Sequence, residues 1–160
     1  LGRLSKEKGI EELLKVAEQL PYKLYIAGRG PLEDILKQKY SSDNIKFVGH
    51  LSAEKIIKLF KKVQFSVIPS IWYDNNPLSA IESLCCGTRV CGRRIGGIPE
   101  LLEKDADNRL FSNEVELMTS LSDMFISSSE VDRQKLSLTS CERFSAELYY
   151  RKWLEVVQSI

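Results

Sequence analysis

Short runs rich in β-forming residues alternate with amphipathic stretches along most of the chain, and this alternation constrains the fold more than any other feature. The β-rich runs fall at residues 23–27, 45–48, 63–68, 89–91 and 110–111. Apolar residues at helical spacing separate them, as in the stretch from Ile10 to Leu20, which ends at Pro21. Such an order predicts a parallel sheet covered by helices. We therefore expect a Rossmann-like α/β domain with three layers, α/β/α.

Helix boundaries are predicted from capping residues and apolar spacing. Pro31 suits the first turn of the helix that follows Gly28-Arg29-Gly30. Ser52 is a suitable N-cap for a helix whose inward-facing residues are Ile56, Ile57 and Phe60. After residue 111 the pattern is helical only, over about 114–127, 132–144 and 145–159.

The composition is that of an ordinary globular domain. With 160 residues, 43% hydrophobic and 28% charged, the chain is long enough to bury the core of one domain. A net charge of +1 gives no field that would attract nucleic acid or an anionic membrane, and no apolar run is long enough to span a bilayer. The chain opens on Leu1-Gly2-Arg3, which we interpret as the end of a strand that begins upstream in a longer polypeptide.

No metal site is expected. The four cysteines form no C-x-x-C pair, so we interpret them as reduced thiols of a cytoplasmic protein. His50 is the only histidine, and we expect a structural or exposed side chain there. Asp105-Ala106-Asp107 matches a D-x-D metal motif but follows a helix rather than a strand, so we interpret it as an acidic surface loop.

The segment from Pro69 to Glu82 is the most informative for function. Asn76 is a good N-cap and Pro77 a good first residue for a helix that ends at Gly87. This helix starts beyond the carboxyl end of a strand, where open α/β sheets bind ligands. Its free N–H groups suit a phosphate or a sugar oxygen.

Two carboxylates flank the start of this helix. Asp74 lies in the preceding loop, and Glu82 lies about one and a half turns inside the helix, at the border of its buried face. That face is expected to consist of Leu78, Ile81, Leu84 and Cys85. Both carboxylates can face one cleft and accept hydrogen bonds from vicinal hydroxyls of a sugar or a ribose. The alternative is a solvated turn residue and a surface helix residue.

A basic loop, Gly2-Arg3-Leu4-Ser5-Lys6-Glu7-Lys8-Gly9, follows the start of the chain. Arg3 offers a planar fork for phosphate oxygens, and Lys8 offers a mobile point charge. Charge-assisted hydrogen bonds contribute about 1.5–3 kcal/mol each. An exposed helix terminus contributes roughly 0.3–1 kcal/mol, so the cations should dominate the binding of a diphosphate. A solvated basic loop is the alternative.

Two glycine-containing loops, at residues 28–30 and 96–97, also follow predicted strands. Glycine lets the backbone approach a ligand closely, although tight turns need it for no functional reason. The first loop lacks the third glycine of a dinucleotide-binding fingerprint, which counts against an NAD site.

Taken in order, these segments resemble the C-terminal domain of glycosyltransferase family four, which has the GT-B fold. The resemblance covers nearly the whole chain. It is carried by Gly2-Arg3-Leu4-Ser5 with Lys8-Gly9, Ile26-Ala27-Gly28 with Gly30-Pro31-Leu32, Ile45 to Gly49, Pro69-Ser70, residues 74–82, Cys86-Gly87-Thr88, and Gly96 to Glu100. Each motif alone is weakly specific, whereas the ordered set is strongly specific.

The resemblance implies roles for individual residues. Arg3 and Lys8 match the pair that binds the donor diphosphate and neutralises its charge as it leaves, and Asp74 and Glu82 match the acidic residues that contact the transferred sugar and the ribose. The candidate catalytic residues are therefore Arg3, Lys8 and Asp74. Backbone amides from Asn75 through Asn76 and Pro77 to Leu78 would face the sugar and phosphates. Gly28, Val48 and Gly49 would form the nucleotide wall.

Three positions depart from the family's pattern. Position 74 is Asp where the family has Glu, and the shorter side chain reaches about 1.5 Å less, enough to lose a direct hydrogen bond unless the loop shifts. Arg89 and Arg93 lie where the family prefers proline and a small polar residue. Sugar choice is therefore less constrained by this sequence than nucleotide binding.

The resemblance implies a retaining glycosyltransferase of the hexosyltransferase type. Residues 1–160, with the C-terminal helices from about 114, would be its donor-binding domain, and an N-terminal acceptor domain would be absent from this chain. The expected ligand is a UDP- or GDP-sugar, with no cofactor or metal. Polysaccharide or glycolipid synthesis is the expected role, with any contact with the inner face of the membrane made by the full-length protein. The alternatives are a non-catalytic nucleotide-binding domain of the same fold and a nucleotide-sugar epimerase.

Overall fold

The chain folds around parallel strands that form two separate sheets. The computed structural model describes residues 1–127 and 131–158. Within these residues β1 (Leu24–Ala27) pairs with β2 (Ile45–Gly49), and β4 (Arg89–Arg93) lies between β3 (Phe65–Ile68) and β5 (Arg109–Phe111). All three pairings are parallel. The predicted parallel α/β architecture is confirmed, with its strands divided between two sheets.

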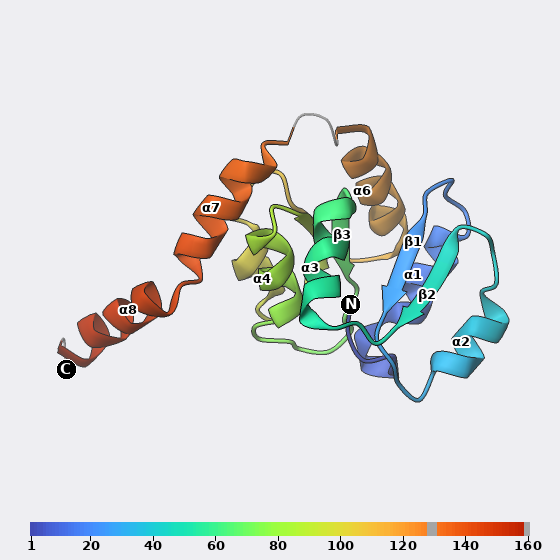
Figure 1. The fold of residues 1–160 in the computed structure, drawn as a ribbon, viewed down its shortest axis with the longest axis horizontal. Helices are drawn as coiled ribbons and strands as arrows, with labels where there is room; N and C mark the ends of the chain where they lie inside the picture. Colours follow the sequence, from blue (N-terminus) through green and yellow to red (C-terminus); the bar gives the residue numbers. More distant parts are fainter. Residues whose placement is uncertain (128–130, 159–160) are drawn as a thin grey trace.

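Helices connect the strands and cover both faces of the sheets (Figure 1). A short 3-10 turn, η1 (Lys6–Lys8), precedes the first helix. The helices are α1 (Ile10–Ala17), α2 (Glu33–Lys39), α3 (Ala53–Lys62), α4 (Leu78–Cys85), α5 (Ile98–Leu102), α6 (Glu114–Ile126), α7 (Arg133–Arg143) and α8 (Ala146–Gln158). Buried residues of α1, α2 and α6 pack against one face of the strands, and those of α4, α5 and α7 against the other. α8 extends away from the rest of the chain.

The alternation of side chains along the strands explains these layers. In β3, Phe65 and Val67 pack with residues of α1 and α6, whereas Ile68 packs with α4. α1 joins the two sheets, because Leu14 packs in the core of β1 and β2 while Leu13 packs with β4, β5 and α6. Leu14 is fully buried, so Leu14→Ala should cost about 2–5 kcal/mol of folding free energy.

The start of α4 differs from the prediction by one residue. The helix begins at Leu78, and Pro77, with φ −66° and ψ 106°, occupies the N-cap position instead of Asn76. The buried residues of the helix are Ala80, Ser83 and Leu84, of which only Leu84 was predicted. Leu78, predicted to be buried, is 68% exposed. Of the other residues predicted for the buried face, Leu84 is buried, and Ile81 packs partly buried against the same core.

Smaller differences occur at α2, α3 and the C-terminal helices. α2 begins at Glu33, so Pro31 lies in the preceding turn and not in the helix. Ser52 occupies the N-cap position of α3 without a capping hydrogen bond from its side chain, and Ile57 is exposed. The helices predicted over 114–127, 132–144 and 145–159 are observed as α6, α7 and α8, and residue 159 lies outside the described residues.

Candidate functional site

The basic loop and the loop that follows β3 are joined at the carboxyl ends of the strands. The Ile71 amide donates a hydrogen bond of 3.0 Å to the Glu7 carbonyl oxygen. Gly9 adopts a left-handed conformation, with φ +62°, and a Cβ atom there would lie 2.0 Å from the Pro69 carbonyl oxygen. Only glycine fits this position, because any side chain would have to displace the Pro69 backbone. The sequence of the basic loop thus places Lys8 directly against the loop that carries Asp74.

Lys8 and Asp74 form an ion pair, with 2.7 Å between Lys8 Nζ and Asp74 Oδ2. The same carboxylate oxygen accepts a hydrogen bond of 2.7 Å from the Ser70 hydroxyl. Ser70 is buried, and the Lys8 and Asp74 side chains are 32% and 20% exposed. The cation can therefore be reached by a ligand from solvent while it is held in a fixed position.

These contacts set the charge state of Asp74. Partial burial alone would raise its pKa, but the hydrogen bonds from Lys8 and Ser70 and the positive charge of Lys8 outweigh that effect. The net result is a pKa below the ordinary value, so Asp74 is ionised at neutral pH. An ionised carboxylate is an acceptor only, which suits the hydroxyl groups of a sugar.

Arg3 and Glu82, the other two predicted charged residues, are exposed. The positive charges of Arg3 and Lys8 both help to lower the pKa of Glu7, after the larger effect of its hydrogen bond with Ser5, which places the two cations near the same carboxylate. Within residues 1–127 and 131–158, neither the Arg3 nor the Glu82 side chain forms a hydrogen bond or an ion pair with the protein. Lys8 and Asp74 are therefore in contact, Arg3 shares the basic loop with Lys8, and Glu82 lies on α4.

The first turn of α4 presents amide groups at the same edge. The Ala80 amide bonds the Pro77 carbonyl oxygen at 2.9 Å, but the Leu78 and Ser79 amides have no backbone acceptor in the described residues. Free amides at a helix start favour an anion. Asn75 and Asn76 are exposed and line a smaller cavity on the side of α5 and α7, whereas Asp74, Pro77 and Leu78 line a larger one.

Glycine allows the remaining loops to come together. The Gly28 amide donates a hydrogen bond of 2.7 Å to the Gly49 carbonyl oxygen, which joins the predicted parts of the nucleotide wall, and the neighbouring Val48 is 37% exposed. The Gly97 amide bonds the Asp74 carbonyl oxygen at 3.0 Å, and a Cβ atom at Gly97 would lie 2.0 Å from the Asn75 carbonyl oxygen. At Gly97, therefore, the absence of a side chain allows close packing against the backbone of the same chain.

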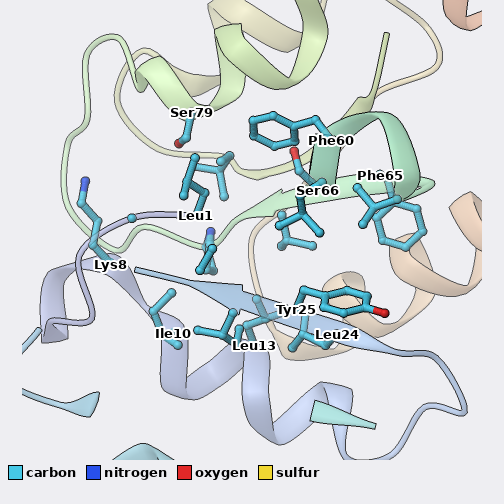
Figure 2. Close-up of a pocket in the computed structure, with 18 of the residues that line it drawn as sticks. Leu1, Lys8, Ile10, Leu13, Leu24, Tyr25, Phe60, Phe65, Ser66 and Ser79 are labelled. Atoms are coloured by element: carbon cyan, nitrogen blue, oxygen red, sulfur yellow. The ribbon is translucent and has the colours of Figure 1, made fainter. Parts of the chain in front are cut away.

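The larger cavity has a volume of about 720 Å³ and two distinct parts. Lys8 and Ser79 lie at one end (Figure 2), and Asp74, the ion-pair partner of Lys8, also lines the cavity. The rest of its wall comes from β1, β3 and the helices beside them and is mainly apolar. The end at Lys8 and Asp74 combines a cation and a carboxylate, which can bind a phosphate and a sugar hydroxyl.

The two arginines that depart from the family's pattern have structural partners. Arg89, only 2% exposed, donates hydrogen bonds to the Met124 carbonyl oxygen and to Ser127 at the end of α6. Arg93 forms an ion pair with Glu12 of α1. The sequence interpretation missed these roles, and it also missed Ser70, for which the Pro69-Ser70 motif was the only signal.

The residues set aside in the sequence lie away from this site or form no cluster. Asp105 accepts a hydrogen bond of 3.1 Å from the Asp107 amide in an exposed loop, and His50 is exposed. The four cysteines are free. In the described parts of the chain, no three His, Cys, Asp or Glu side chains converge as a metal site would require. Nor does any helix there have the length and apolar character needed to cross a membrane.

Comparisons of the sequence with known proteins agree on one family. Residues 1–137 match the family described as "Glycosyl transferases group 1". An uncharacterized glycosyltransferase of Methanocaldococcus jannaschii is 33% identical over 115 residues, which cover 67% of this chain and 29% of that protein. A GDP-mannose-dependent alpha-(1-6)-phosphatidylinositol dimannoside mannosyltransferase of Mycobacterium tuberculosis is 31% identical over 118 residues, covering 68% of this chain and 31% of that protein.

Solved structures agree with the fold. Anabaena HepE in complex with UDP superposes with a TM-score of 0.83 at 19% identity, over 100% of this chain and 48% of that one. The lipopolysaccharide outer core galactosyltransferase WaaB superposes with a TM-score of 0.83 at 18% identity, over 99% of this chain and 47% of that one. The chain thus spans under a third of these curated relatives and about half of the solved chains.

Proposed function

The chain belongs to the group 1 glycosyltransferases, and we propose that it is the nucleotide-sugar-binding domain of a retaining enzyme of this family. The observation that carries the proposal is the Lys8–Asp74–Ser70 cluster beside the start of α4. It combines a cation for phosphate, a carboxylate for sugar hydroxyls and free backbone amides at one edge of the sheet. A surface salt bridge alone, or a glycine turn alone, would not require a cation, a carboxylate and free amides at the same edge.

The proposed roles follow the chemistry of each group. Lys8 and Arg3 bind the diphosphate, and the amides at the start of α4 add partial positive charge. Asp74 binds the transferred sugar, and Glu82 on the second turn of α4 binds the ribose. Gly28, Val48 and Gly49 form the wall beside the base.

The proposed reaction transfers a sugar from a nucleoside diphosphate sugar to an acceptor hydroxyl with retention at the anomeric carbon. The bond between the anomeric carbon and the diphosphate oxygen breaks, and the leaving diphosphate takes the electron pair. The acceptor oxygen forms the new bond to the anomeric carbon, and its proton passes to the leaving diphosphate. Lys8 and Arg3 stabilise the charge that develops there, so the mechanism requires no metal ion. Because Glu82 binds the ribose in this scheme, it does not act as the nucleophile of a retaining hydrolase.

We further propose a UDP- or GDP-sugar as donor. The UDP-sugar is supported by the Anabaena neighbour, which was solved in complex with UDP and with UDP-glucose. The GDP-sugar is supported by the mycobacterial relative, which is GDP-mannose-dependent. The acceptor would bind another domain of the same polypeptide, in cytoplasmic synthesis of a surface polysaccharide or glycolipid. On this proposal residues 1–160 alone bind nucleotide weakly and transfer no sugar.

Calorimetric titration of the chain with UDP, GDP and their sugar conjugates tests the proposal. Lys8→Ala should weaken nucleotide binding, whereas Lys6→Ala should leave it within about twofold. Lys6 is the matched control because it is an exposed lysine in the same loop, without a partner among the described residues. Equal affinity of both variants and the parent chain would overturn the assignment, as would sugar transfer by residues 1–160 alone.

A further inference from the structure

Three of the four cysteines lie close together where the end of α4 meets α7. Cys85 is the last residue of α4 and Cys86 follows it, whereas Cys141 lies on α7, 56 residues beyond Cys85. Cys85 and Cys86 are half-buried and Cys141 is exposed, whereas the fourth thiol, Cys91, is buried in β4. The three clustered thiols lie outside the candidate site, so its chemistry does not account for them.

The packing of α7 against α4 brings these thiols together (Figure 1). Leu136 of α7 packs with Leu84 of α4 in one apolar cluster. The Ser137 hydroxyl donates a hydrogen bond of 2.5 Å to the Cys85 carbonyl oxygen at the end of α4. Cys141 follows Ser137 by four residues, so it lies on the same face of α7. The contact between the two helices therefore fixes the position of Cys141 against Cys85.

Cys141 and Cys85 are in direct contact. The Cys141 thiol donates a hydrogen bond to the Cys85 carbonyl oxygen, with 3.7 Å between Sγ and the oxygen. Burial raises the pKa of the Cys85 thiol, and a hydrogen bond with the Cys141 side chain and the charge of ionised Cys141 raise it further. A disulfide requires Cβ atoms about 3.5–4.5 Å apart, so it forms only between side chains that already meet. Cys85 and Cys141 meet this condition without movement of either helix.

Cys86 is the less suitable partner for Cys141. Cys141 influences the pKa of Cys86 through its charge, whereas it is also hydrogen-bonded to Cys85. Cys86 lies near two cations, Lys61 and Arg133, whose positive charges act against burial, the largest cause of its raised pKa. The contacts therefore favour a bond from Cys141 to Cys85 over one to Cys86.

We propose that Cys85 and Cys141 form an oxidation site, at which hydrogen peroxide converts the two thiols into a disulfide between α4 and α7. In the first step the Cys141 sulfur attacks one peroxide oxygen, the O–O bond breaks, and the other oxygen leaves as water with the thiol proton. In the second step the Cys85 sulfur attacks the sulfenic sulfur, the S–S bond forms, and hydroxide leaves as water with the Cys85 proton. Two thiols and one peroxide thus give one disulfide and two molecules of water.

Exposure and charge set the order of the two steps. Cys141 is exposed and can be reached by peroxide, whereas Cys85 is half-buried and its raised pKa keeps it protonated. Oxidation of Cys141 to the neutral sulfenic acid removes the negative charge that helped to raise the pKa of Cys85. Cys85 then ionises more readily, as the second step requires. The inference stands on the contact between two thiols and holds whether or not the candidate site binds a nucleotide sugar.

Treatment of the reduced chain with hydrogen peroxide tests the proposal. In the parent chain the peptides that contain Cys85 and Cys141 should become linked, as read by mass spectrometry after alkylation, and dithiothreitol should separate them. Cys86→Ser is the matched control, because it removes the neighbouring half-buried thiol and should leave the link intact. In Cys85→Ser the reaction should stop at a sulfenic acid on Cys141, which dimedone traps.

The link should also stabilise the fold. A disulfide that closes a loop of 56 residues restricts the unfolded chain, so the oxidised parent should melt about 5 °C or more above the reduced parent. Cys141→Ser replaces an exposed side chain and should fold normally, so its melting temperature should not change with peroxide.

Three outcomes would overturn the proposal. Loss of the link in Cys86→Ser, with its retention in Cys85→Ser, would make Cys86 the partner of Cys141. A linked product found only between two chains, as a dimer in non-reducing electrophoresis, would show that the two thiols do not meet within one molecule. Equal melting temperatures for the oxidised and reduced parent would show that the bond distorts the contact between α4 and α7. None of these measurements uses a nucleotide, so failure of the proposed function would leave them unchanged.

Discussion

Asp74→Asn separates the two functions proposed for the candidate site. In the structure Asp74 neutralises Lys8 at 2.7 Å, so the carboxylate competes with a diphosphate for the same cation. The amide of asparagine can still accept hydrogen bonds from Lys8 and Ser70 but carries no charge. We therefore expect Asp74→Asn to tighten the binding of UDP alone, while it weakens the contact with the sugar and lowers transfer by the full-length enzyme.

The expected magnitude follows from the exposure of the pair. Partly exposed ion pairs contribute about 0.2–1 kcal/mol, and this one, with its additional hydrogen bond from Ser70, belongs in the upper half of that range. Loss of that competition corresponds to an affinity for UDP about two- to fivefold higher. Lys8→Ala removes a charge-assisted hydrogen bond to the diphosphate, worth about 1.5–3 kcal/mol. It also removes the cost of breaking the Lys8–Asp74 ion pair, so we expect the affinity for UDP to fall about 5- to 25-fold.

Isothermal titration of UDP into the parent chain, Asp74→Asn, Lys8→Ala and the double variant measures these effects. The double-mutant cycle isolates the coupling between the two residues. In the double variant, Asp74→Asn should no longer tighten UDP binding, because that gain depends on the Lys8 side chain. If Asp74→Asn instead weakens UDP binding as much as Lys8→Ala does, Asp74 supports the diphosphate site rather than competing with it, and the reasoning is refuted.

The same ion pair gives a pH dependence of stability. The pKa of folded Asp74 lies below its ordinary value of 3.8, so its ionised form stabilises the fold above that value. This contribution is lost as the pH falls through the lower pKa of the folded state. In urea unfolding the parent chain should be more stable than Asp74→Asn at pH 6, and the difference should shrink below about pH 4. A difference that grows on acidification would contradict the assigned ion pair.

Two further predictions concern backbone geometry and thiol reactivity. Gly9→Ala should lower stability by more than about 3 kcal/mol in urea unfolding, because φ is +62° and Cβ would lie 2.0 Å from the Pro69 oxygen. Gly49→Ala, with φ +69° but no heavy atom within 4 Å of the added Cβ, should cost only about 1–2 kcal/mol, and equal costs would contradict the proposed clash. Burial raises the pKa of Cys91 to about 12, so iodoacetamide should label exposed Cys141 long before Cys91, as read by peptide mass spectrometry.

The strands could be predicted from the sequence because their composition is local information. The five β-rich runs coincide with the observed strands to within about two residues at most ends. Their division into two sheets could not be predicted, because strand pairing depends on contacts between distant segments and not on local composition. The buried face of α4 was predicted only in part: Leu84 is buried as expected, but Ser83, a polar residue, is also buried and forms hydrogen bonds with Ser66 and the Thr88 carbonyl oxygen.

The candidate site, like the fold, could be predicted only in part from the sequence. The residue types and their order implied roles for Lys8 and Asp74, but not that the two are bonded to each other across 66 residues of sequence. That contact depends on Gly9 and Pro69, whose close approach is a property of the folded loops. The same limit applies to Arg93, whose partner Glu12 lies 81 residues away on α1.

The contacts of Asp74 with Lys8 and Ser70 show how its short side chain is positioned. One methylene less is about 1.5 Å less reach, and the carboxylate is held back against Lys8 and Ser70. A glutamate at position 74 would reach further toward the end of the cavity and would release Ser70. Asp74→Glu should therefore change the choice of sugar more than the affinity for the nucleotide, which depends on Lys8 and Arg3. Comparison of UDP with several UDP-sugars in both variants measures the two effects separately, and a large change in UDP affinity alone would show that position 74 acts on the diphosphate instead.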